Sequence, residues 1–73
     1  MRYLAEVRVF EKSLSDIITM DYVSEFYIDK NYNLVISEAR KAAKAIGGKI
    51  KIVVVDQEEM KIIYSHTRYY KKV

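Results

Sequence analysis

The sequence predicts a small α+β domain, in which a four-stranded, mainly antiparallel sheet carries one helix on one face. The predicted order is strand–strand–helix–strand–strand. Three observations lead to this fold class. Residues 1–12 alternate between apolar and charged side chains, residues 31–48 join an apolar stripe of helical period to a double glycine, and residues 49–56 form an apolar run of strand length.

The first strand is predicted over residues 1–12, because the side chains of a strand point alternately to opposite faces. One face of this strand carries Tyr3, Ala5, Val7 and Val9. The other face carries charged residues together with Leu4 and Phe10. Residues 13–16 are rich in serine and aspartate, whose side chains bond to the nearby backbone, so we expect a turn there.

Residues 17–29 admit two interpretations. The alternation of apolar with polar residues from Ile18 to Ile28 favours a second strand that pairs with the first. The rival is a helix capped by Ser13 or Ser15, but its apolar positions do not share one face, and its β-branched residues lower the helix propensity. We expect the strand, followed by a turn into the next element.

Residues 32–46 are predicted to form the helix. Its apolar stripe repeats with a period of 3.6 residues and consists of Tyr32, Val35, Ile36, Ala39, Ala42, Ala43 and Ile46. Asn31 or Asn33 can cap the first turn, and the glycine pair at 47–48 can end the helix in the left-handed conformation. The alternative is a short strand at the start of this segment, with Ser37 capping a shorter helix. We expect the longer helix.

Two further strands complete the predicted sheet. Residues 49–56 form the clearest strand, with one face made of Ile50, Ile52 and Val54. A polar turn of hairpin length follows, and the chain returns over residues 60–68, with Ile62 and Tyr64 on the face opposite Ile63. We expect the last five residues to be frayed or loosely docked.

The strands are apolar on both faces, although one helix can cover only one face of the sheet. The second face is predicted to hold Leu4, Phe10, Val23, Tyr27, Val53, Val55 and Ile63. A contiguous exposed apolar patch marks an interface, so we expect this face to bind a second copy of the chain or a larger protein. The alternative is an ordinary surface, in which the stems of neighbouring arginine and lysine side chains shield the apolar residues.

Length and composition narrow the class of protein. Seventy-three residues suffice for one domain, 1–73, of a size that buries only about 60% of its unfolded surface. The chain has no cysteine, and a lone histidine among scattered carboxylates does not make a metal site. No apolar stretch is long enough to cross a membrane, and the alternating N-terminal segment is unlike a signal peptide. We expect a cytoplasmic protein without metal or cofactor.

One segment carries residue types that phosphodiester chemistry uses. Residues 64–70 contain an imidazole for acid–base work, a guanidinium to bind phosphate, and aromatic rings for bases. The hairpin over 49–68, followed by two tyrosines, resembles the closing hairpin of RelE-type ribonuclease toxins, and this resemblance implies His66, Arg68 and Tyr70 as the matching positions. That family opens with a helical pair, whereas this chain opens with a predicted strand. The alternative is that His66 is a strand-end residue and that Arg68 keeps the tail soluble.

Basic residues are concentrated in the second half of the chain. Residues 37–73 hold nine lysines and arginines against four acidic residues, whereas residues 1–36 hold four against six. Such asymmetry can mark a surface for an anionic partner. The phosphate contacts of a nucleic acid are predicted to fall on Arg40, Lys41, Lys44, Lys49, Lys51, Arg68, Lys71 and Lys72. The alternative is a solvated basic surface that keeps the domain soluble.

The sequence thus supports three classes of function, none of them carried by a strong motif. The first is a small non-enzymatic interaction module, acting as a homodimer or as an adaptor or inhibitor of a larger protein. The composition resembles that of small phage-like accessory proteins. The second class is a nucleic-acid-binding protein that uses the basic helix face and the C-terminal tail. The third is a ribonuclease built on His66, Arg68 and Tyr70.

Overall fold

A computed structural model describes residues 2–12 and 19–72 of the chain. The elements are β1 (Tyr3–Lys12), β2 (Thr19–Asp29), α1 (Tyr32–Ile46), β3 (Gly48–Asp56) and β4 (Lys61–Tyr70). The four strands form one antiparallel sheet in the order β2-β1-β3-β4, with α1 packed against it. The predicted fold class is therefore confirmed. The turn predicted at 13–16 lies outside the described residues.

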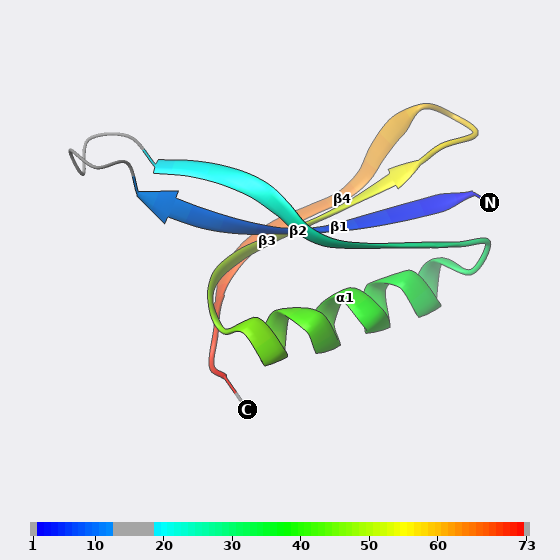
Figure 1. The fold of residues 1–73 in the computed structure, drawn as a ribbon. Coiled ribbons are helices and arrows are strands. Elements are labelled where there is room, and N and C mark those ends of the chain that lie inside the picture. Colours follow the sequence, from blue (N-terminus) through cyan, green and yellow to red (C-terminus); the bar gives the residue numbers. More distant parts are fainter. Residues whose placement is uncertain (1, 13–18, 73) are drawn as a thin grey trace.

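The helix covers one face of the sheet, and no described element forms a second layer on the other face (Figure 1). Because β2 and β3 are both antiparallel to β1, they run parallel to each other on either side of it. The chain passes from β2 to β3 through α1, which lies mainly across β1 and β2 and touches β3 less. We call the side away from the helix the open face.

The helix begins and ends at the residues that the sequence predicts. Asn31 caps the first turn, where its side-chain oxygen accepts a hydrogen bond from the backbone N–H of Leu34 at 3.2 Å. Gly47 ends the helix with a φ of 77°, in the region that glycine adopts without steric cost. The longer of the two predicted helices is therefore confirmed.

The core lies between α1 and the central strands. On the helix, the fully or nearly buried residues are Val35, Ile36, Ala39, Ala42 and Ala43. On the sheet, they are Ala5, Val7, Ile50, Ile52 and Val54. Small residues face each other where Ala39 and Ala43 meet the strands, so the helix backbone can approach the sheet closely. Towards the start of the helix, the rings of Tyr3 and Tyr32 pack edge to face, with 5.6 Å between centroids.

The segment 17–29 forms a strand where the structure describes it, but the strand contains a β-bulge that the alternation did not predict. Val7 lies opposite Glu25, whereas Arg8 lies opposite Val23, so Ser24 is left unpaired. The extra residue reverses the direction of every side chain beyond it. Tyr27 is therefore on the helix side and packs against the core, and the prediction that it lies on the second face is wrong.

A second bulge changes β4 in the same way. Val54 lies opposite Tyr64 and Val55 lies opposite Ile62, so Ile63 occupies the unpaired position. Ile62 consequently takes the place on the open face that the alternation gives to Ile63. The strand also continues to Tyr70, whose side chain is only 4% exposed, so the expectation of a frayed end from residue 69 is wrong.

A partly buried ion pair joins the start of β1 to the end of β3. Asp56 is almost fully buried, and one carboxylate oxygen accepts hydrogen bonds from the Nε and Nη2 of Arg2 at 3.1 and 2.9 Å. The other oxygen accepts from the backbone N–H groups of Glu58 and Glu59, which shapes the turn into β4. The Arg2 hydrogen bond, helped by these N–H donors, lowers the pKa of Asp56 to about 2.

We predict that Ala43→Leu destabilises the protein by about 1–3 kcal/mol, because Ala43 is fully buried and the added methyl groups would overpack the contact between helix and sheet. Ala45, two residues further along the helix, is exposed. Ala45→Leu is therefore the matched control and should change the free energy of unfolding by no more than about 0.5 kcal/mol. Chemical denaturation followed by circular dichroism measures both values, and equal stability of the two variants would contradict the packing described here.

We predict that stability falls on acidification from about pH 4 to pH 2 partly through Asp56. Its pKa in the folded protein, about 2, lies below the usual value of about 3.9. The ionised carboxylate therefore favours the fold above the usual value, and this contribution is lost as the pH falls through the folded value. Asp56→Asn should lower the melting temperature at pH 6 and flatten its decline towards pH 2.

The control for this prediction is Glu59→Gln, because Glu59 is more exposed and its carboxylate lies 3.7 Å from the same arginine. Thermal melts from pH 6 to pH 2 should show a decline like that of the parent protein for Glu59→Gln. An unchanged acid profile in Asp56→Asn would mean that the Arg2 pair contributes nothing to acid stability.

Candidate functional site

The open face carries a straight row of apolar side chains across all four strands. Leu4 of β1 lies opposite Ile28 of β2 on one side and opposite Val55 of β3 on the other, and Val55 lies opposite Ile62 of β4. Side chains paired in this way point to the same face of a sheet. Leu4 and Val55 are half-buried, whereas the outer members of the row, Ile28 and Ile62, are 42% and 63% exposed.

A second row widens the apolar region next to the first. Glu6 lies opposite Phe26 on one side and Val53 on the other. Phe26 is 62% exposed, a large fraction for an aromatic ring, whereas Val53 is only 5% exposed. The apolar residues of these two rows form what we call the open-face patch: Leu4, Phe26, Ile28, Val53, Val55 and Ile62.

Charged residues lie on the rest of the open face, among Phe10, Val23 and Tyr69. The Nε of Arg8 lies 3.1 Å from a carboxylate oxygen of Glu6, and its Nη1 lies 3.5 Å from Asp21. Lys51 lies opposite Arg8 on the neighbouring strand, and the ammonium of Lys49 is 4.6 Å from the centroid of the Phe10 ring. The open face is therefore apolar at one end and charged, with both signs, at the other.

Five of the seven residues predicted for the second face are on the open face: Leu4, Phe10, Val23, Val53 and Val55. Tyr27 faces the helix, and Ile63 is the unpaired residue of a bulge. The sequence pattern missed Phe26, Ile28 and Ile62, which are the most exposed members of the patch. Composition does not reveal a bulge. The sequence feature that could have indicated the bulge in β2 is the break in the apolar–polar alternation at Tyr22-Val23.

The residues predicted to contact nucleic acid fall on two different sides of the molecule. Lys49 and Lys51 are on the open face, away from the helix. Arg40, Lys41 and Lys44 line a shallow hollow on the outer surface of α1. The ammonium of Lys41 lies 3.8 Å from Glu38, one turn away, whereas Arg40 and Lys44 have no carboxylate within 4.0 Å among the described residues.

Four cationic side chains meet where the last turn of α1 approaches the end of β4. Together with Tyr70, they line one hollow, which we call the basic hollow: Lys44, Arg68, Lys71 and Lys72. Lys44 also lines the hollow on the helix, so the two are continuous. None of the four has a carboxylate within 4.0 Å in the part of the chain that the structure describes.

The three residues implied by the likeness to ribonuclease toxins share one face of β4. His66, Arg68 and Tyr70 lie opposite Ile52, Ile50 and Gly48, on the helix side of the sheet. His66 is exposed, with its ring 6.4 Å from that of Tyr64. The guanidinium of Arg68 lies over the ring of Tyr70, 4.6 Å from its centroid, and that ring is buried in the core. The arrangement therefore offers the guanidinium of Arg68 and the exposed imidazole of His66, whereas Tyr70 packs in the core.

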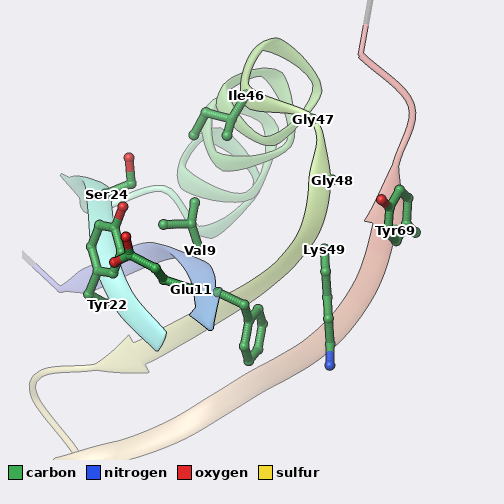
Figure 2. Close-up of a pocket in the computed structure, with 10 residues that line it drawn as sticks. Val9, Glu11, Tyr22, Ser24, Ile46, Gly47, Gly48, Lys49 and Tyr69 are labelled. Carbon is green, nitrogen blue, oxygen red and sulfur yellow. The ribbon is translucent and has the colours of Figure 1, made fainter. Parts of the chain in front are cut away.

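A further hollow lies at the end of the sheet beside Gly47 and Gly48 (Figure 2). Val9, Tyr22 and Ile46 gather on its helix side, whereas Lys49 extends away from them. Its remaining polar lining does not form a cluster of ionisable groups that converge on one point. It is the open end of the core, and we assign it no chemistry.

Within residues 2–12 and 19–72, no group of three or more histidine or acidic side chains gathers as a metal site. No helix in these ranges is long and apolar enough to cross a membrane. Comparison of the chain with known protein families, with curated proteins and with solved structures finds no match in any of the three. A functional assignment therefore rests on the open-face patch and the basic hollow themselves.

Proposed function

We propose that this protein is a non-enzymatic interaction module whose open-face patch binds a second copy of the chain. The observation that carries the proposal is the unbroken row Ile28–Leu4–Val55–Ile62, which crosses the whole sheet and has no covering layer in the described structure. Burying exposed apolar surface is worth about 25 cal/mol for each Å². The patch contains three of the large exposed apolar side chains of the sheet, Phe26, Ile28 and Ile62.

A second copy fits this face because the patch can meet itself. A two-fold axis through the centre of the row would bring the apolar row of one sheet against that of the other. The charged end, with Glu6, Arg8, Asp21 and Lys51, would then point in opposite directions in the two copies. Like charges would be kept apart, and the charged groups would stay in contact with water.

The size of the face argues for a weak dimer. Four strands spaced by about 4.8 Å, over the length of about six residues at 3.4 Å each, offer roughly 390 Å² of sheet surface per copy. Two copies would bury about 780 Å², which is below the standard size of a stable interface and at the low end of transient contacts. Dimerisation should therefore depend on protein concentration.

We predict that Phe26→Lys abolishes the dimer while leaving the fold intact. Phe26 is 62% exposed and contributes nothing to the core under α1, so the monomer tolerates a lysine. At the interface, the lysine of each copy would be desolvated without a carboxylate partner in the apolar row that it meets. The dissociation constant should rise at least about tenfold, which corresponds to about 1.4 kcal/mol. Sedimentation equilibrium over a range of concentrations measures it.

Met20→Lys is the matched control, because Met20 is on the same strand and is also 62% exposed, but points to the helix side. It should leave the dissociation constant unchanged. A monomer at all concentrations would contradict the homodimer. Val53→Lys is less informative, since Val53 is only 5% exposed and a lysine there would disturb the sheet of the monomer itself.

A further inference from the structure

We propose that the basic hollow and the neighbouring strip of β4 form a binding site for single-stranded nucleic acid. The chemistry recognised is a phosphodiester backbone with unstacked bases, whether DNA or RNA. This site is on the opposite side of the molecule from the open-face patch, so it does not depend on dimerisation. It uses Lys44, Arg68, Lys71 and Lys72, together with Arg40, His66 and Tyr64.

The first support is uncompensated charge. Four cations in one hollow repel one another, and no described carboxylate lies within 4.0 Å of any of them. The hollow also lies at the C-terminal end of α1, whose partial negative charge favours Lys44 but cannot neutralise four cations. A row of phosphates would neutralise them, and the counterions released from the nucleic acid would drive binding. Arg40, one helical turn before Lys44, extends the same surface.

The second support is that the fold holds these cations in place. A Cβ added at Gly47 would come within 2.8 Å of the Cβ of Lys72, so Lys72 lies directly against the end of α1, where the described part of the chain passes that helix end (Figure 1). Tyr70, buried beneath the hollow, anchors the tail and supports the guanidinium of Arg68 on its ring. Arg68, Lys71 and Lys72 are thus carried by a docked segment, which reduces the entropy lost when they bind phosphate.

The third support distinguishes a nucleic acid from other polyanions. The helix side of β4 is largely outside the cover of α1, and it presents Tyr64, His66 and Arg68 at successive alternate positions. The His66 ring is exposed beside the ring of Tyr64, at 6.4 Å between centroids. Planar rings next to a basic track are the two parts that single-stranded nucleic acid requires, because bases stack on the rings while the cations follow the backbone. The carboxylates of an acidic peptide would not stack on these rings.

The test uses the full chain and fluorescein-labelled 15-nucleotide probes of oligo(dT), oligo(rU) and an abasic DNA strand, with binding followed by anisotropy between 50 and 300 mM salt. The variant Lys44→Gln/Arg68→Gln/Lys72→Gln should reduce the salt slope of log affinity by about 2, at about 0.7 for each lost contact, and weaken binding about 100-fold at 0.1 M salt. Lys30→Gln/Lys49→Gln/Lys51→Gln removes the same charge elsewhere and should retain the slope.

A second variant separates stacking from charge. His66→Ala should weaken binding to oligo(dT) or oligo(rU) and leave binding to the abasic strand unchanged, since His66 is exposed and has no packing role in the core. A preference between the two base-bearing probes would identify the source as DNA or RNA.

Three results would overturn the proposal. One is the absence of binding to any probe at 50 mM salt. Another is an equal loss of affinity in the two triple variants, which would show that binding depends on net charge alone. The last is displacement of the labelled strand by polyglutamate as readily as by unlabelled oligo(dT), which would make the hollow a site for an acidic protein.

Discussion

The fold depends on the close contact between the alanine-rich stripe of α1 and the two central strands. Ala39 and Ala43 are fully buried against a sheet surface that is itself built from small and β-branched residues. The chain has 73 residues and no cysteine, so this contact, the backbone ladders between the strands and the Arg2–Asp56 pair hold the elements together. The helix covers β1 and β2 with part of β3, and this limit leaves the strip of β4 exposed on the helix side of the sheet.

Two single-residue bulges decide which side chains reach the open face. Both are in the outer strands, at Ser24 of β2 and Ile63 of β4, while the central strands β1 and β3 pair with each other in an unbroken ladder. The bulges turn large apolar residues away from the helix: Phe26 and Ile28 in β2 and Ile62 in β4. Without them Tyr27 and Ile63 would take these places on the open face, and Phe26, Ile28 and Ile62 would point to the helix side. The patch is thus a product of the bulges as much as of the composition.

The two candidate surfaces have different physical characters and lie on opposite sides of the sheet. The open face offers the apolar area of the open-face patch and a set of charges of both signs, which suit a self-complementary contact. The basic hollow offers positive charge held by a docked chain end, as a polyanion requires. A dimer through the open face would direct two basic hollows outwards, and a strand long enough to reach both would gain affinity from the second contact.

The sequence by itself determined the element types, the helix and its caps, and the faces of β1 and β3, because periodicity and short-range capping are local properties that need no knowledge of neighbouring strands. It also identified the cationic residues. Only the tertiary structure decided the strand order, the positions of the bulges, and the separation of Lys49 and Lys51 from Lys44 and Arg68. Those features depend on which strands pair and on where the pairing register shifts by one residue. Both are set by contacts between residues far apart in the chain, including the packing of the sheet against α1.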